Sequence, residues 1–261
     1  MQDLQFTGKV ALVTGAAQGI GEAIVRALCK QGAVVAAVDL QQDTLNQLAS
    51  ELKEQGLGAF AYPADVRDSE SVQAVVDRIE RELGPIELLV HAAGVLRMGA
   101  LTSLSDADWS DVMSVNLNGV FHISRAVLSY MKPRRNGAVV TVSSNAAAIP
   151  RMHMGAYATS KAAVTMFTKC LGLELAEYGI RCNIVSPGST DTPMLRSMWE
   201  DESGAQRTIE GSLETYRTGI PLRKLAAPED VASSVLFLLS AQAGHLTMHD
   251  LRVDGGATLG V

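Results

Sequence analysis

The side chains best suited to acid–base chemistry lie in one stretch, residues 144–161, which reads SNAAAIPRMHMGAYATSK. Tyr157 and Lys161 are four positions apart, so on a helix they lie on one face. A phenol has a pKa of about 10 and is a poor base at neutral pH, but neighbouring positive charges favour the phenolate. With a hydrogen bond from Ser144 to the substrate oxygen, this set can take a proton from an alcohol while a hydride leaves the same carbon.

The Tyr157–Lys161 spacing also has a simpler interpretation, because a Tyr-x-x-x-Lys pair on its own is more often part of a solvated helix face. Two further features favour chemistry. Ser144 follows an apolar run that reads as a strand, and a glycine-rich turn near the N-terminus is typical of dinucleotide binding.

The elements that position these residues are short apolar runs alternating with longer helical stretches. We expect strands over residues 9–14, 33–39, 59–63, 86–91, 138–143, 180–186 and 246–253. We expect helices over residues 19–31, 44–55, 69–83 (with Ser69 as N-cap), 106–131, 157–178 and 228–240. This alternation predicts an α/β fold with a parallel sheet covered by helices on both faces. No linker is apparent, so we expect one domain over residues 1–261.

The glycine-rich turn reads Thr14-Gly-Ala-Ala-Gln-Gly-Ile-Gly21, between the first expected strand and the first expected helix. Free N–H groups at a helix N-terminus attract phosphate, and glycine lets the backbone approach it closely. The turn therefore predicts a pyrophosphate site, although an ordinary glycine-rich connection has the same composition.

Asp39 ends the second expected strand, where a carboxylate can accept hydrogen bonds from ribose hydroxyls and repel a 2′-phosphate. Its neighbours Leu40 and Gln41, and Gln18 of the glycine turn, carry no positive charge to offset that repulsion. We therefore predict NAD rather than NADP. The alternative is an ordinary turn or N-cap aspartate, which is common at strand ends.

Composition excludes several classes of function. Hydrophobic residues make up 47% and charged residues 19% of the 261 residues, as in a packed globular protein. The net charge is −6 without a long basic run, which disfavours nucleic-acid and membrane partners. The first ten residues lack the pattern of a signal peptide, and no apolar stretch is long enough to span a bilayer.

The three cysteines, Cys29, Cys170 and Cys182, are widely spaced and lack a Cys-x-x-Cys pair. This pattern favours reduced, packed thiols in a cytoplasmic protein over a disulfide framework or a zinc site. We predict no metal site.

Taken together, these motifs resemble the short-chain dehydrogenase/reductase family over essentially the whole chain. The family implies a Rossmann-type three-layer sandwich with a seven-stranded parallel sheet, usually in a homotetramer. It implies a catalytic set of Asn116, Ser144, Tyr157 and Lys161, in which the asparagine holds a water that links the lysine to solvent. The cofactor residues implied by the matching motifs, with the Asp39 described above, are Gly15, Gln18, Gly19, Ile20, Gly21, Asp39, Asp65, Val66, Ala92, Ala93, Gly94, Tyr157, Lys161, Pro187, Gly188 and Thr190.

One motif departs from the family. The family often reads Asn-Asn-Ala-Gly after the fourth strand, whereas this chain reads His91-Ala92-Ala93-Gly94. The asparagine hydrogen bonds that brace that turn are therefore lost or replaced by His91, which we expect to be a structural residue.

Substrate-side stretches at residues 94–100, 149–152, 181–192 and 253–260 resemble family members that oxidise a carboxylated cyclic dihydrodiol. A carboxylate needs a cation or several donors. Arg97 and Arg151 are the candidate cations, Ser144 the candidate donor to the reacting oxygen, and Met194 a candidate apolar wall. Against this, surface arginines are usually only solvated, and methionines usually fill gaps in a core.

Other readings stay open. A related family member could act on a ketoacyl thioester or a polyol, and an inactive NAD-binding protein could keep the glycine turn. Asp39 disfavours an NADPH-using reductase, paired Arg97 and Arg151 favour a carboxylate over a neutral polyol, and the intact Tyr157–Lys161 pair disfavours an inactive protein. The polar segment 195–220 reads equally well as a mobile substrate lid or as an ordinary surface helix-turn-helix.

Overall fold

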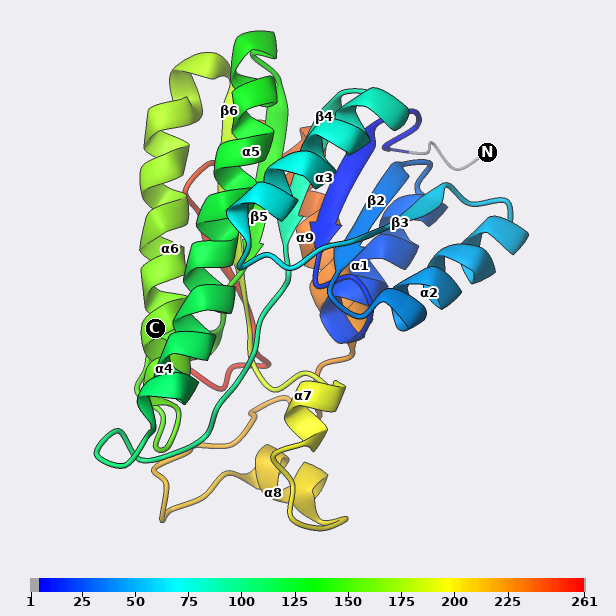
Figure 1. Cartoon of the computed structure of the whole chain (residues 1–261). Coiled ribbons are helices and arrows are strands. Elements are labelled where there is room, and N and C mark those ends of the chain that lie inside the picture. Colours follow the sequence, from blue (N-terminus) through cyan, green and yellow to red (C-terminus); the bar gives the residue numbers. More distant parts are fainter. Residues whose placement is uncertain (1–4, 261) are drawn as a thin grey trace.

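A parallel sheet forms the centre of the molecule in the computed structural model, which describes residues 5–260 (Figure 1). Part of the segment for which we predict no signal peptide therefore lies outside the described residues. The described strands form a seven-stranded sheet in the order β3-β2-β1-β4-β5-β6-β7. Their bounds are β1 Val10–Thr14, β2 Val34–Asp39, β3 Ala59–Pro63, β4 Ile86–His91, β5 Gly137–Val142, β6 Ile180–Pro187 and β7 Asp250–Val253.

Helices cover both faces of this sheet, because successive residues of each buried strand point to opposite sides. β1 gives Ala11 and Val13 to one apolar core and Val10 and Leu12 to the other. The first core packs against α1 Gly19–Lys30, α2 Gln42–Glu54 and α9 Pro228–Leu239. The second core packs against α3 Ser69–Glu82, α5 Gly119–Arg134 and α6 Gly155–Leu175. The three-layer α/β prediction is confirmed.

The remaining helices lie near the carboxyl edge of the sheet. α4 Asp106–Met113 continues through the π-helical turn Ser114–Asn118 into α5, while α7 Pro193–Arg196 and α8 Gly204–Glu210 follow β6. Figure 1 shows α7 and α8 below the sheet, apart from the two helical layers. Short 3-10 turns occur at Asn145–Ala147, Ala176–Tyr178 and Ala241–Ala243. No helix in the described part of the chain is long and apolar enough to cross a membrane.

The strand order places a binding crevice at the carboxyl ends of β1 and β4. The chain runs outward from β1 through β2 to β3 and then returns to β4 on the other side of β1. The connections that leave β1 and β4 therefore turn in opposite directions, and a crevice opens between them. Thr14 pairs with His91 across this point, so the glycine turn and residues 92–94 face each other.

The expected helical region 106–131 is helical throughout, with a π turn inside it where backbone bonding widens from four to five residues. Two predicted details are wrong. The N-cap of α3 is Asp68, whose carboxylate accepts from the amides of Glu70 and Ser71, and Ser69 is the first helical residue. The last strand begins at Asp250 rather than 246, because Met248 has a φ of 61°, outside the extended region.

Candidate active site

The glycine turn fits closely against the backbone after β4. Gly15 has a φ of 65°, and a Cβ there would lie 2.6 Å from the backbone of Ala93. A Cβ on Gly21 would overlap the carbonyl oxygen of Gly15. The N-cap residue of α1, Gln18, makes no side-chain hydrogen bond to the first turn of the helix. The turn therefore forms a shallow cradle at a helix N-terminus, which fits a pyrophosphate.

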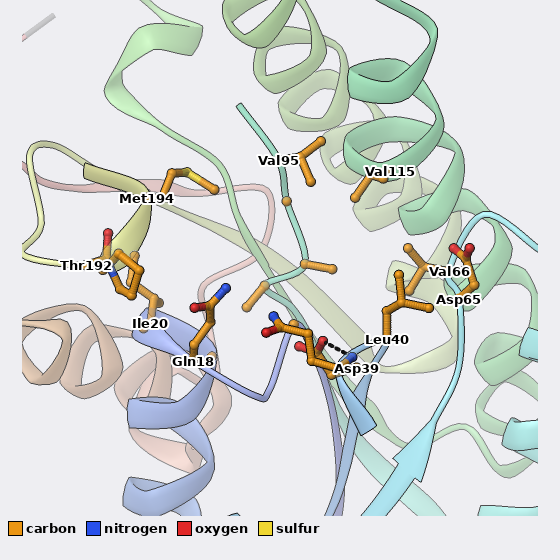
Figure 2. A pocket seen from close by; sticks show the side chains of 18 of the residues that line it. Gln18, Ile20, Asp39, Leu40, Asp65, Val66, Val95, Val115, Thr192 and Met194 are labelled. Atoms are coloured by element: carbon orange, nitrogen blue, oxygen red, sulfur yellow. Dashed lines mark hydrogen bonds between the residues drawn. The ribbon is translucent and has the colours of Figure 1, made fainter. Parts of the chain in front are cut away.

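Asp39 braces this cradle, a role that its position in the sequence did not indicate. One carboxylate oxygen accepts a hydrogen bond from the amide of Ala17 at 3.0 Å, and the other accepts from the amide of Gln41 at 2.9 Å. Because a carboxylate has about four acceptor sites, both oxygens keep capacity for the hydroxyls of a ribose. Figure 2 shows Asp39 beside Leu40 among the residues that line the pocket, with Gln18 on its other side.

A single elongated pocket contains most of the predicted cofactor residues (Figure 2). It lies at the carboxyl ends of β1, β2, β3 and β4. The predicted residues that line it are Gly15, Gln18, Gly19, Ile20, Gly21, Asp39, Asp65, Val66, Ala92, Ala93 and Gly94. Thr192, Pro193 and Met194 of the α7 segment form the opposite wall. The residues present therefore fit a dinucleotide that extends from Asp39 toward β4.

The turn after β4 is braced by Thr14. We expected the missing asparagine bonds to be lost or replaced by His91, and the structure shows no bond from His91 to this turn within residues 5–260. The amides of Ala92 and Ala93 lie 3.2 and 3.3 Å from the hydroxyl oxygen of Thr14, which accepts from both. His91 faces away into the core, where its Nε2 lies 3.0 Å from the hydroxyl of Ser124. Burial lowers the pKa of His91 to about 3, so the imidazole is neutral and structural.

The buried histidine predicts a specific loss of stability in acid. The folded pKa of His91 is about 3 and its ordinary value is 6.5, so between these pH values only the unfolded chain takes up the proton. The free energy of unfolding therefore falls as the pH falls below 6.5, by about 2 kcal/mol at pH 5. We expect urea unfolding at pH 7.5 and pH 5 to show this loss in the wild type and not in His91→Asn. Equal losses in both proteins would assign the acid sensitivity to other groups.

A second pocket adjoins the first at the carboxyl ends of β4, β5 and β6. Ile20, Ala92, Gly94, Thr192 and Met194 line both pockets, so the two are continuous. The second pocket brings together the predicted residues Ser144, Arg151, Tyr157, Lys161, Pro187, Gly188, Thr190 and Met194. Three of the predicted catalytic residues and the cofactor residues predicted at and just after the end of β6 thus line the same pocket.

Burial controls the charges in this pocket. Lys161 is buried, donates to the carbonyl oxygen of Val142 at 2.9 Å and lies 5.6 Å from the centre of the Tyr157 ring. Burial lowers the pKa of Lys161 to about 8. Burial also raises the pKa of Tyr157, while a hydrogen bond with Ser144 acts in the opposite direction. A phenolate at neutral pH therefore requires more positive charge in the pocket than Lys161 alone supplies.

Asn116 lies beside this pocket rather than in its lining. Its side-chain oxygen accepts from the amide of Val95 at 2.8 Å, and its nitrogen donates to Val95 O and to the Ser160 hydroxyl, both at 3.0 Å. A Cβ on Gly94 would be 3.5 Å from both Asn116 Oδ1 and Lys161 Nζ, so these two side chains flank the same glycine. Asn116 thus ties the π turn to the strand exit and to α6.

The two candidate arginines lie in different places. Arg97 lines the first pocket, is about half exposed and forms an ion pair with Asp111 at 2.8 Å, so the structure does not bring it to Ser144 and Tyr157. Arg151 lines the second pocket, is half-buried and has no ion pair within residues 5–260. Arg217 also lines that pocket. It comes from the polar segment 195–220, where no motif indicated it.

Comparisons with known proteins agree with this architecture. A family model described as short chain dehydrogenase matches residues 9–203. The chain is 63% identical to the 2,3-dihydro-2,3-dihydroxybenzoate dehydrogenase of Bacillus subtilis, with 97% of each chain covered. It is 43% identical to the vibriobactin-specific 2,3-dihydro-2,3-dihydroxybenzoate dehydrogenase of Vibrio cholerae, with 99% of each covered.

Its fold also matches the crystal structure of a gluconate 5-dehydrogenase from Burkholderia cenocepacia in complex with NADP and tartrate. The TM-score is 0.91 at 30% identity, with 99% of this chain and 98% of that chain covered. The family model, these relatives and the continuous double pocket lead to one conclusion: the chain belongs to the short-chain dehydrogenase family.

Proposed function

We propose that this protein oxidises 2,3-dihydro-2,3-dihydroxybenzoate to 2,3-dihydroxybenzoate with NAD, as a step of catecholate siderophore biosynthesis. The 63% identity to the Bacillus subtilis enzyme of that name supports the substrate. The observation that carries the proposal is the placement of Arg151, a half-buried arginine without an ion pair among the described residues, in the same pocket as Ser144, Tyr157 and Lys161. That arrangement suits an alcohol with a carboxylate nearby.

The chain's own residues have distinct roles in this proposal. Tyr157 takes the proton of a ring hydroxyl, which we place on C3, and Ser144 donates a hydrogen bond to that oxygen. Lys161, fixed by the carbonyl of Val142, contributes positive charge, and the family role of Asn116 is to support the path of the proton to solvent. Loss of this proton together with the hydride of the same carbon leaves a ketone, which tautomerises to the catechol, and the gain of aromaticity makes the overall reaction strongly favourable.

The cofactor residues suit NAD. When bound, the oxidised nicotinamide ring supplies the hydride acceptor and a second positive charge in the pocket. Gly15, Gly19 and Gly21 would hold the pyrophosphate, Asp39 the adenosine ribose, and residues 187–190 would lie near the nicotinamide. The Asp39 carboxylate would repel a 2′-phosphate, and its neighbours Leu40 and Gln41 are uncharged.

We also propose the context that the family resemblance implies. The chain would act in the cytoplasm as a single Rossmann-type domain within a homotetramer. The segment 195–220 contributes Leu195, Met198 and Arg217 to the second pocket, which supports a role as the lid over the substrate.

The proposed function is tested by following reduced nicotinamide after mixing the protein with NAD and 2,3-dihydro-2,3-dihydroxybenzoate. Parallel reactions contain NADP, or the matching dihydrodiol without its carboxylate. Turnover that is fastest with NAD and the carboxylated diol would support the proposal. Activity on a neutral alcohol or a ketoacyl thioester, without activity on the carboxylated diol, would contradict it.

Arg151→Ala is expected to raise KM for the carboxylated diol by about 10- to 100-fold, because a hydrogen bond to a charged group contributes about 1.5–3 kcal/mol. The matched control is Arg97→Ala, which removes an arginine that is ion-paired and lies in the other pocket. Steady-state kinetics at saturating NAD give both KM values. A larger effect from Arg97 than from Arg151 would reverse the assignment.

A further inference from the structure

Arg217 is held on a tight hairpin after α8. Its amide and carbonyl exchange hydrogen bonds with Ser212 at 2.8 and 2.9 Å. The glycines at both ends of the hairpin, Gly211 and Gly219, have φ values of 90° and 77°, and a Cβ on Gly219 would be 2.5 Å from the Glu210 carbonyl oxygen. The side-chain hydroxyl of the next residue, Thr218, donates to the carbonyl of Ala257 at 3.1 Å. The backbone of Arg217 is therefore fixed, although the hairpin loop is exposed.

The Arg217 side chain differs from the other arginines of this segment. Arg196 pairs with Asp191 at 2.7 Å and Arg207 pairs with Asp201 at 3.0 Å, both at the surface. Arg217 is half-buried, and its guanidinium has neither an ion pair nor a hydrogen bond within residues 5–260. A guanidinium has five N–H donors, so this one faces the pocket with its donors available.

The pocket around Arg217 is strongly cationic. Among the described residues, its lining includes Arg151, Lys161 and Arg217 and no aspartate or glutamate. Arg217 is close enough for its charge to lower the pKa of Arg151, and burial lowers the pKa of both. Lys161 donates a hydrogen bond to the carbonyl of Val142, whereas neither arginine side chain has a hydrogen-bond or ion-pair partner in the described chain.

Asp254 does not neutralise the two arginines. The carboxylate of Asp254 raises the pKa of Arg151, but it forms no ion pair with either arginine in the described chain. Instead it accepts from the hydroxyl of Thr258 at 2.8 Å and from the amide of Gly256 at 2.9 Å. Two partly desolvated like charges without an ion-pair partner are unfavourable. A bound anion would reduce their repulsion and accept hydrogen bonds from their unpaired N–H groups.

We propose that Arg217 binds the substrate carboxylate together with Arg151 and so selects a carboxylated ring over a neutral diol. A carboxylate has about four acceptor sites, enough for donors from two guanidinium groups. Because α8 and the hairpin lie outside the sheet, this contact ties the segment 195–220 to the presence of the substrate's charge. This inference extends the proposed function, and it rests on that proposal for the identity of the substrate ring.

The test compares kcat/KM for 2,3-dihydro-2,3-dihydroxybenzoate with kcat/KM for the same cyclic diol without the carboxylate. In Arg217→Ala we expect the ratio to fall by about 10- to 100-fold, mostly through KM of the carboxylated diol. Arg217→Lys should recover part of the ratio, because it keeps the charge and loses the forked geometry. Arg207→Ala, an exposed and ion-paired arginine of the same segment, is the control and should leave the ratio unchanged.

Two outcomes would overturn the inference. If the wild type oxidises the carboxylated diol and the ratio in Arg217→Ala changes by less than about threefold, Arg217 does not bind the carboxylate and the proposed function stands. If Arg217→Ala does not fold, Arg217→Gln removes the charge with less loss of packing, and an unchanged ratio there has the same meaning.

The inference can also be tested if the proposed function fails. If the wild type does not oxidise the diol, calorimetric binding of benzoate to the NAD complex of the wild type and of Arg217→Gln replaces kinetics. Weaker binding by about tenfold or more in the variant would support an anion site at Arg217, and equal binding would overturn it.

Discussion

Tyr157→Phe is expected to lower kcat by about 10³-fold while the protein still binds NAD, because the phenol oxygen is the proposed base and a phenyl ring has no acid–base group. The side chain is half-buried beside Ser144 and Lys161, and no other phenol lines the pocket within residues 5–260. The loss should be largest above the pKa of Tyr157, where the wild type holds the phenolate, and smaller in acid, where the wild-type phenol is itself protonated.

The measurement is single-turnover formation of reduced nicotinamide, with NAD affinity determined separately by calorimetry. Tyr130→Phe is the matched control, because it removes a phenol that bonds Asp77 at 2.9 Å far from either pocket. Turnover in Tyr157→Phe above about a tenth of wild type would remove Tyr157 from the role of base. Loss of NAD binding in that variant would instead indicate a structural role.

Asp39→Asn is expected to lower the preference for NAD over NADP by about 10- to 100-fold, because the charge that repels a 2′-phosphate is lost. Asp39→Ala should lower the preference for NAD and also weaken the binding of both cofactors. It also removes both acceptors that hold the amides of Ala17 and Gln41, so KM should rise for the two cofactors alike. Asp39→Asn keeps one of these two acceptors, so the comparison of the two variants separates the loss of charge from the complete loss of bracing of the glycine turn.

Both effects are read from kcat/KM for NAD and for NADP at saturating substrate. Asp43→Asn, an exposed aspartate in the first turn of α2, is the control for a general change in surface charge. A ratio that stays the same in Asp39→Asn would mean that another group discriminates the 2′-phosphate. The structural match to a protein crystallised with NADP makes this ratio informative.

Much of the fold is predictable from local patterns. Apolar runs bounded by glycine or polar residues identify all seven strands, and the glycine turn between β1 and α1 identifies the crevice. The π turn could not be predicted in this way. Its residue Asn116 is held by Val95 and Ser160, which lie 21 and 44 positions away in the sequence, so its geometry depends on the assembled fold.

The catalytic residues of the site could likewise be predicted from local patterns, whereas the roles of its arginines could not. Tyr157 and Lys161 are four positions apart on one helix, and Ser144 follows a strand, so their spacing in the sequence is enough to identify them. The arginines are different, because exposure and ion pairing decide their availability. Arg97 is paired with Asp111 of α4, whereas Arg217 has no ion pair among the described residues, although Arg196 and Arg207 of the same segment do.

The shared wall of the two pockets has a thermodynamic consequence. Thr192 and Met194, at the start of α7, line both the pocket that fits the cofactor and the one that contains Tyr157. A ligand that orders this wall from one side prepares it for the other, so the two affinities are coupled. Linkage requires the coupling to be reciprocal: the factor by which NAD tightens the diol equals the factor by which the diol tightens NAD.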